Sequence, residues 1–185
     1  MRVKGKKASR QGFCAFFVCS SGYGLEALSG KTYLPSVMKR YPKKSVHEID
    51  RTNLAEPSLD SVQRSRFREG IDLFNRKEFW EAHEAWEEVW MRCGEESRIF
   101  FQGIIQAAAA YHLILVKKRF SGALSNIEKS RAKLGLFPGS FLGMDVDRLR
   151  SDLNRTKEAM EQLGPGRLGE FSHSLLPHID VKVGG

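Results

Sequence analysis

A chain of 185 residues, of which 41% are hydrophobic, is long enough to bury one core, so we expect one domain with terminal extensions. The formal net charge is +8, but residues 1–50 hold ten Lys and Arg against three acidic residues, whereas residues 61–163 hold seventeen against fifteen. Because a nucleic-acid-binding domain needs its positive charge on a folded face, this distribution argues against a nucleic-acid partner. We also expect no membrane partner, because no apolar run approaches the length needed to cross a bilayer.

Residues 1–57 have the composition of a basic, poorly structured leader in which glycine and serine recur. Three interpretations remain open: a secretory signal, an organelle transit segment, and a start assigned upstream of the true initiator, for which Met38 is the candidate. The apolar stretch in the leader is at the short limit for a secretory signal, and no clear small-x-small cleavage site follows it. We therefore expect a cytoplasmic protein or, if residues 1–50 are a transit segment, a protein of a plastid or another organelle.

The chain contains three cysteines, Cys14, Cys19 and Cys93. Three thiols, two of them in the leader, make neither a disulfide framework nor the paired spacing of a zinc site. This cysteine usage is typical of a reducing compartment.

Hydrophobic periodicity between residues 58 and 163 predicts an all-α domain. Five helices are expected in chain order, at about residues 62–74, 78–91, 98–117, 121–134 and 145–163. Ser58, Asp60 or Ser61 is expected to cap the first helix. The third helix is apolar nearly all round, so we place it at the centre of the bundle. Residues 164–185 are predicted to form a loosely held C-terminal tail.

Small residues and aromatics recur along the domain at a regular spacing. The positions are Gly70, Leu73, Phe79, Ala82 and Trp86, and most of the spacing recurs at Tyr111, Phe120, Ala123 and Ile127. This spacing is typical of tetratricopeptide helical hairpins, in which small residues let two helices touch and aromatics fill the gaps beside them. We therefore expect a compact bundle of about five helices, built as two stacked tetratricopeptide-like hairpins plus a capping helix.

The stretch Phe79–Trp90, FWEAHEAWEEVW, holds all the tryptophans of the chain and one of its histidines. On a helix, His83, Glu87 and Trp90 fall on one stripe. An imidazole and a carboxylate one turn apart beside a tryptophan indicate either a reactive site or a buried polar pair.

This stretch and the residues around it resemble a known family. Phe74 and Asn75, followed by FWEAHEAWEEVW, FFQGIIQAAAAYH and FSGAL, are similar to the bacterial, archaeal and plastid family called domain of unknown function 309, whose hallmark is His-x-x-x-Glu-x-x-Trp. The similarity covers residues 67–134 and, more weakly, the fifth helix; Lys118 and Arg119 stand where members often carry Gly-Asn. The resemblance implies a compact all-helical domain and a metal role for the hallmark, because some members are labelled predicted metal-dependent hydrolases.

His83 and Glu87 are the candidate catalytic and metal-ligating residues, because side chains at i and i+4 converge on a helix. Gln106, Gln102 or His112 from the third helix would complete the shell of a divalent metal. The spacing is not that of a zincin, since Glu87 occupies the place of the second histidine ligand. The alternative is a buried His83–Glu87 pair, hydrogen-bonded to Gln106 or Gln102, which needs no cofactor.

Other residues of the second helix extend this candidate network. Glu84, Trp86 and Trp90 complete it around His83, and most of the aromatic residues also belong to the core. Trp80 is the exception, because it is also a candidate surface anchor for a partner chain. The acidic residues around Glu84 form either a solvated face or a surface that meets a basic partner.

Two functions of different classes remain open. The first is a metal-assisted hydrolase that uses His83 and Glu87 as ligands, or as a base and the group that orients it. The second is a small interaction module, whose partner is a second copy of the chain or another protein bound on the helical face. The residues favour the interaction module, whereas the family resemblance supports the hydrolase.

Overall fold

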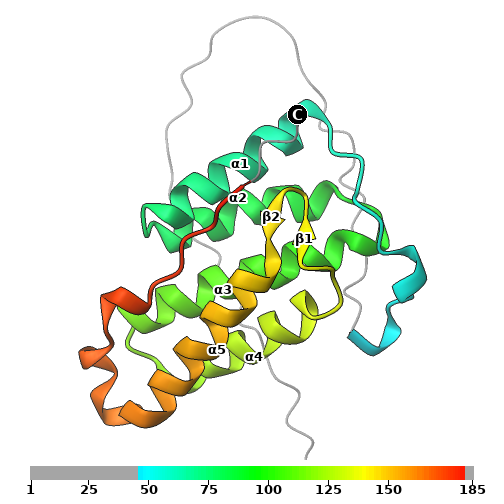
Figure 1. Ribbon diagram of the computed structural model, residues 1–185. Helices are drawn as coiled ribbons and strands as arrows, with labels where there is room; N and C mark the ends of the chain where they lie inside the picture. Colours follow the sequence, from blue (N-terminus) through cyan, green and yellow to red (C-terminus); the bar gives the residue numbers. More distant parts are fainter. Residues whose placement is uncertain (1–45, 182–185) are drawn as a thin grey trace, which may run out of the picture. The chain divides into compact units, whose positions relative to one another are not determined.

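The structure is a computed structural model that describes residues 46–181. Five α-helices make up most of this part of the chain: α1 (Ser61–Asn75), α2 (Phe79–Arg92), α3 (Ile99–Leu115), α4 (Phe120–Leu134) and α5 (Val146–Leu163) (Figure 1). A small antiparallel sheet, formed by β1 (Ser140–Phe141) and β2 (Met144–Asp145), lies between α4 and α5. The predicted all-α bundle is confirmed, and each helix begins and ends close to its predicted limits.

Part of the predicted leader falls on residues that the structure does not describe. The secretory, transit and upstream-start interpretations concern residues 1–45, which lie outside the described residues, as do Cys14, Cys19 and residues 182–185.

α1 and α5 begin at aspartates that act as N-caps. Asp60 Oδ1 accepts a hydrogen bond from the Gln63 N–H at 2.7 Å, and Gln63 Oε1 accepts one from the Asp60 N–H at 2.9 Å. This reciprocal pair is a capping box, which satisfies two backbone donors. Asp145 Oδ1 accepts from the Arg148 N–H at 2.9 Å in the same role. The starts of both helices are therefore fixed by local side-chain chemistry.

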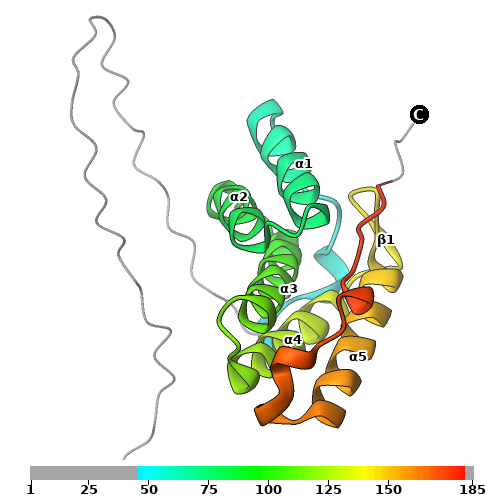
Figure 2. The same ribbon diagram turned by 90° about the vertical axis from the view of Figure 1, so that its left-hand side faces the viewer.

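α3 is the central helix, packed between α2 and α4, while α5 lies against α4 (Figures 1 and 2). Phe100, Phe101 and Tyr111 of α3 are fully buried. Contrary to the expectation from sequence, Glu96–Leu115 is long and apolar enough to cross a membrane by length and composition alone. In this domain 61% of that apolar window is buried, so its apolar surface is used for packing against the neighbouring helices.

The contact between α1 and α2 depends on one small residue. A Cβ atom added at Gly70 would lie 2.3 Å from Nε1 of Trp86, closer than any real contact. Trp86 is fully buried, and its indole N–H donates to the Phe67 carbonyl of α1 at 3.1 Å. The two helices therefore approach closely enough for an indole to lie on the backbone of α1.

Both flanks of the predicted domain pack onto the helices, so the prediction of a loosely held tail differs from the structure. Leu168, Phe171 and Ile179 of the tail are buried, and Ile49, which we assigned to the leader, is also in the core. These apolar residues are isolated between glycines, prolines and polar residues. They give no helical or strand period, and the sequence pattern therefore does not reveal them.

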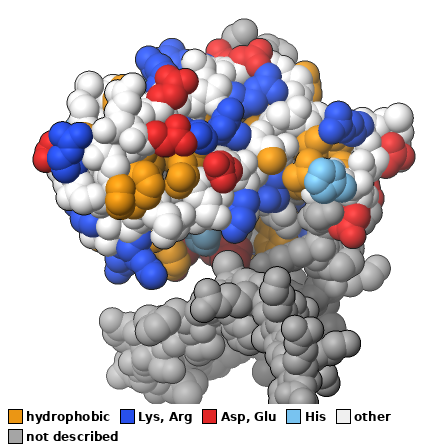
Figure 3. Space-filling model, turned by 90° about the horizontal axis from the view of Figure 1, so that it is seen from below, with side chains coloured by type: hydrophobic (Ala, Val, Ile, Leu, Met, Phe, Trp, Pro, Cys, Tyr) orange, Lys and Arg blue, Asp and Glu red, His pale blue; other side chains and the backbone are white. Residues whose placement is uncertain are grey.

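The surface of the described residues mixes charges of both signs. On the face shown in Figure 3, Lys and Arg side chains lie among Asp, Glu and hydrophobic side chains. This arrangement agrees with the near balance of charge that the sequence gives for residues 61–163.

Candidate functional site

His83 lies on α2 and faces the backbone of α3. Its Nδ1 is 3.3 Å from the Ile105 carbonyl oxygen. A carbonyl can only accept a hydrogen bond, so Nδ1 carries the hydrogen and donates it. Nε2 lies 3.8 Å from Oε2 of Glu87, and the two form an ion pair when the imidazole is protonated. The His83 side chain is 19% exposed and that of Glu87 is 47% exposed, so the histidine is turned inward and the glutamate lies at the rim.

Gln106, one of the predicted partners of His83, is bound elsewhere. Its Oε1 accepts a hydrogen bond from Nζ of Lys133 on α4, at 2.9 Å. Neighbouring residues on a helix point about 100° apart, so α3 presents the Ile105 backbone to α2 and the Gln106 side chain to α4. Gln102 lies one turn before Gln106 on the same stripe of α3 and is partly buried. The predicted His–Glu–Gln network is therefore not the one that the structure forms.

Trp80 contacts two histidines, His83 of α2 and His112 of α3. Its indole stacks on the His83 imidazole with the ring centroids 5.0 Å apart and the planes at 7°, and it lies at 49° to His112 with the centroids 5.3 Å apart. The indole N–H donates to Oε1 of Glu84, one turn along α2, at 3.0 Å. Trp80 is nonetheless 44% exposed. It is therefore an exposed aromatic residue held in one orientation from two sides.

His112 lies at the α3 side of this cluster. Its partial burial lowers the pKa of the imidazole, and the positive charge of Lys117 and the neighbouring His83 lower it further, whereas Glu81 opposes them. Val116 follows His112 by one turn of helix and is 62% exposed. Two imidazoles and an indole therefore lie in contact on α2 and α3, with the exposed Val116 one helical turn after His112.

Trp86 and Trp90 do not cover the His83–Glu87 pair. Trp86 belongs to the core between α1 and α2, as described above. The Trp90 ring faces the guanidinium of Arg98, whose carbon lies 4.5 Å from the ring centroid, and Arg98 also donates to the Trp90 carbonyl at 3.2 Å. Trp90, predicted to complete the network around His83, instead makes a cation–π contact at the α2–α3 connection.

Comparison with protein families identifies this region. The family model described as Domain of unknown function (DUF309) matches residues 67–126. Residues 67–126 of the chain are therefore similar to the DUF309 family. No curated protein matches the chain. The DUF309 match contains α2 and α3 in full, so it includes Trp80, His83, Glu87 and His112.

The metal role that the DUF309 resemblance implies needs a set of donors that converge. Within residues 46–181, no group of three or more His, Cys, Asp and Glu side chains is placed to hold a metal ion. His83 Nε2 and the Glu87 carboxylate are two donors, Gln106 is bound to Lys133, and His112 contacts Trp80. Two donors at a half-exposed position do not fit the three or four protein ligands of a tight site.

Two polar features of the helical domain were not indicated by the sequence. Burial lowers the pKa of the Lys133 ammonium, with a smaller effect from Lys129, and its hydrogen bond goes to an uncharged amide. Burial also raises the pKa of the Cys93 thiol, which makes Cys93 a poor nucleophile. Neither residue stands in a spacing that a sequence pattern would single out.

Proposed function

We propose that the domain is an interaction module that binds a basic segment of a partner protein. The binding surface would be the Trp80 surface, which we define as Trp80, Glu81, Glu84 and Glu87 of α2 with Val116, the C-cap residue of α3. The tetratricopeptide-like pairing of α1 with α2 and of α3 with α4, expected from sequence, would present this surface on the α2–α3 side. The observation that carries the proposal is the fixed and exposed indole of Trp80.

The geometry of Trp80 supports a role as a binding anchor. Its indole is held by stacking on His83 and by the hydrogen bond to Glu84, so little side-chain freedom remains to be lost on binding. Tryptophan is also enriched among the residues that dominate binding energy at protein interfaces. A large aromatic residue that is 44% exposed and already ordered therefore fits a contact surface better than a core position.

The charges beside Trp80 indicate what kind of segment would bind. Glu84 and Glu87 lie on the same stripe of α2 as Trp80, and Glu81 is close enough to His112 to act on its pKa. Three carboxylates around an indole favour a Lys or Arg side chain, which can pair with a carboxylate and also contact the aromatic ring. A basic segment that also carries an apolar residue to contact Val116 would match the surface.

A titration with defined peptides tests this function. We expect a Lys- and Leu-containing basic peptide to bind the full chain, and an acidic peptide of the same length not to bind, by calorimetry. Trp80→Ala should weaken binding of the basic peptide about tenfold or more. Val62→Ala, which removes another exposed apolar side chain on α1, should leave binding unchanged. Equal binding of both peptides, or equal effects of the two variants, would contradict the proposal.

A second copy of the chain is the alternative partner for the same surface. Sedimentation of the parent and of Trp80→Ala distinguishes it, because a dimer that forms through this surface would dissociate in the variant. A monomer at all concentrations leaves the basic partner as the occupant.

Metal-assisted hydrolysis is the second candidate function, and one observation favours it. The Ile105 carbonyl fixes the hydrogen of His83 on Nδ1, which leaves the Nε2 lone pair of the neutral ring directed at the side of Glu87. Metal-ligating histidines are commonly oriented in this way. Metal analysis of protein purified without a histidine tag tests it: stoichiometric metal in the parent and in His112→Ala, with none in His83→Ala, would support the hydrolase. Parent protein without metal after growth in metal-supplemented medium would count against it.

A further inference from the structure

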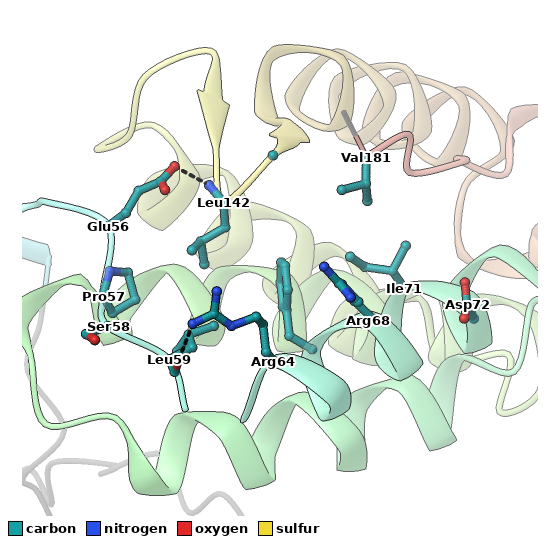
Figure 4. A pocket seen from close by; sticks show the side chains of 12 residues that line it. Glu56, Pro57, Ser58, Leu59, Arg64, Arg68, Ile71, Asp72, Leu142 and Val181 are labelled. Carbon is teal, nitrogen blue, oxygen red and sulfur yellow. Dashed lines mark hydrogen bonds between the residues drawn. The ribbon is translucent and has the colours of Figure 1, made fainter. Parts of the chain in front are cut away.

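A cleft lies on the side of α1 that faces the small sheet, away from α2. It has a volume of about 640 Å³. Its walls come from segments far apart in the sequence: residues 56–59, α1, the turn at Leu142 and Gly143, and Val181 (Figure 4). This volume is within the range of about 300–1,000 Å³ that is usual for small-molecule sites. The Trp80 surface shares none of these residues.

The walls of the cleft are fastened to one another by hydrogen bonds. The Glu56 carboxylate accepts from the Leu142 N–H at 2.6 Å, which joins the N-terminal segment to the β1–β2 turn. Arg64 donates to the Leu59 carbonyl at 2.7 Å, which joins α1 to the same segment. Val181 pairs with Met144 in an antiparallel bridge. The cleft is therefore shaped by the fold before any ligand arrives, so binding would need little ordering.

The cleft is lined by apolar side chains and by two arginines. Phe67 and Ile71 of α1 line its apolar side together with Leu142 and Val181 from other segments. Val181 is 39% exposed, so part of this apolar lining is open to solvent. A ligand with an apolar body could cover it and would gain from removing that surface from water.

Arg64 and Arg68 lie on successive turns of α1 and project from the helix towards this lining (Figure 4). Arg64 gives one nitrogen to Leu59, which leaves its other donors for a ligand. A guanidinium binds a carboxylate through two parallel hydrogen bonds. Of the acidic side chains that line the cleft, Glu56 is engaged by Leu142, and Asp72 lies one turn beyond Arg68.

We propose that this cleft binds a small amphipathic carboxylate, with its head on Arg64 and Arg68 and its apolar body between Phe67, Leu142 and Val181. A free small molecule fits better than a polypeptide that runs through, because the Glu56–Leu142 hydrogen bond ties two walls together at one side of the cleft. The carboxylate head accounts for the arginines and the apolar body accounts for the lining. Neither feature alone would specify this ligand.

Decanoate is the probe, added to the full chain below its micelle-forming concentration and followed by calorimetry and by amide chemical shifts. We expect saturable binding at one site, with shifts at Arg68, Leu142 and Val181. Decanol, which has the same chain without the charge, should bind about tenfold more weakly, since hydrogen bonds to charged groups are the stronger ones. No saturable binding, or equal binding of decanol, would overturn the proposal.

Two substitutions in the cleft have opposite expected effects. Arg68→Gln should weaken decanoate binding about fivefold to tenfold, because it removes one of the two cations that line the cleft. Asp72→Asn should strengthen decanoate binding about twofold, because it removes a nearby negative charge. Arg76→Gln is the matched control, since Arg76 follows α1 directly, pairs with Glu78 and does not line the cleft. Equal weakening by the control, or unchanged binding in Arg68→Gln, would show that decanoate binds elsewhere.

Discussion

Asn75 and Ile179 exchange two hydrogen bonds across 104 positions of sequence. The Asn75 side-chain N–H donates to the Ile179 carbonyl at 2.9 Å, and the Ile179 N–H donates to Asn75 Oδ1 at 2.8 Å. Lys77 adds a bond from Nζ to the Pro177 carbonyl at 2.7 Å. The turn between α1 and α2 thus holds the C-terminal segment in place through one amide side chain that satisfies both a backbone donor and a backbone acceptor.

We expect Asn75→Asp to lower the free energy of unfolding by about 1–3 kcal/mol, because a carboxylate cannot donate to the Ile179 carbonyl. Chemical denaturation measures the loss. Asn126→Asp is the control, since the Asn126 side chain bonds only within its own helix, to the Gly122 carbonyl. An equal loss in both variants would contradict a special role for Asn75.

Gly70→Ala should lower the free energy of unfolding by about 2 kcal/mol or more, because its Cβ would overlap the Trp86 ring. The Trp86 indole N–H should also lose its hydrogen bond to Phe67, which an indole resonance in the NMR spectrum would report. Gly169→Ala is the control, since a Cβ there meets nothing within 4 Å. A thermal transition unchanged from the parent in Gly70→Ala would contradict the observed packing.

Tyr111→Phe should lower the free energy of unfolding by about 1–2 kcal/mol, because it leaves the buried Thr156 hydroxyl without its partner. The two oxygens are 2.9 Å apart in the parent. Thr156→Val alone should cost a similar amount, and the double variant should cost less than the sum of the two. Additive losses would show that the two hydroxyls do not interact.

Because of Tyr111, we also expect the free energy of unfolding to depend on pH in the alkaline range. Burial raises the pKa of Tyr111 above its ordinary value of about 10, so the unfolded chain loses this proton at a lower pH than the folded chain does. The stability that the neutral phenol contributes is therefore fully present below pH of about 10 and is lost as the pH rises further. The free energy of unfolding, measured by denaturation at increasing pH, should fall in the parent and fall less in Tyr111→Phe. An equal fall with pH in both proteins would contradict this role of Tyr111.

His112 should titrate below an ordinary histidine, because its partial burial, together with Lys117 and His83, disfavours the charged ring. NMR titration of the imidazole C–H resonances measures this pKa directly. Trp80→Ala opens one side of the ring to water, so the pKa of His112 should rise towards its ordinary value. Val62→Ala should leave it unchanged. A pKa for His112 that does not respond to Trp80→Ala would contradict the contact.

The helices could be predicted because their signals are local. Asp60 and Asp145 cap α1 and α5, and Gly70 with Trp86 marks a close contact between helices. The partner of Gln106 could not be predicted in the same way. Periodicity gives the angle of Gln106 around α3, but it does not say which neighbour lies at that angle, and that neighbour is α4.

The site around His83 was predicted in position and only partly in its contacts. His83 is mostly buried and Trp80 is 44% exposed, whereas the role of Trp80 as an anchor for a partner stays a prediction. The acceptor for His83 is a backbone carbonyl, which every residue carries, so no side-chain pattern could indicate Ile105. The two arginines of the cleft have no signature of their own, because its opposite wall comes from Leu142 and Val181.

The pairing of Asn75 with Ile179 also constrains the order in which a growing chain can become native. Asn75 is synthesised 104 residues before Ile179, so its side-chain amide cannot form this pair until Ile179 has been added. α1 to α4 contact their neighbours in sequence and can pack during that interval. The segment that contains Pro177 and Ile179 can pack onto them only after it has been synthesised. A chain that ends just before Pro177 would therefore lack these contacts, and its turn after Asn75 should be more accessible to proteases than in the full chain.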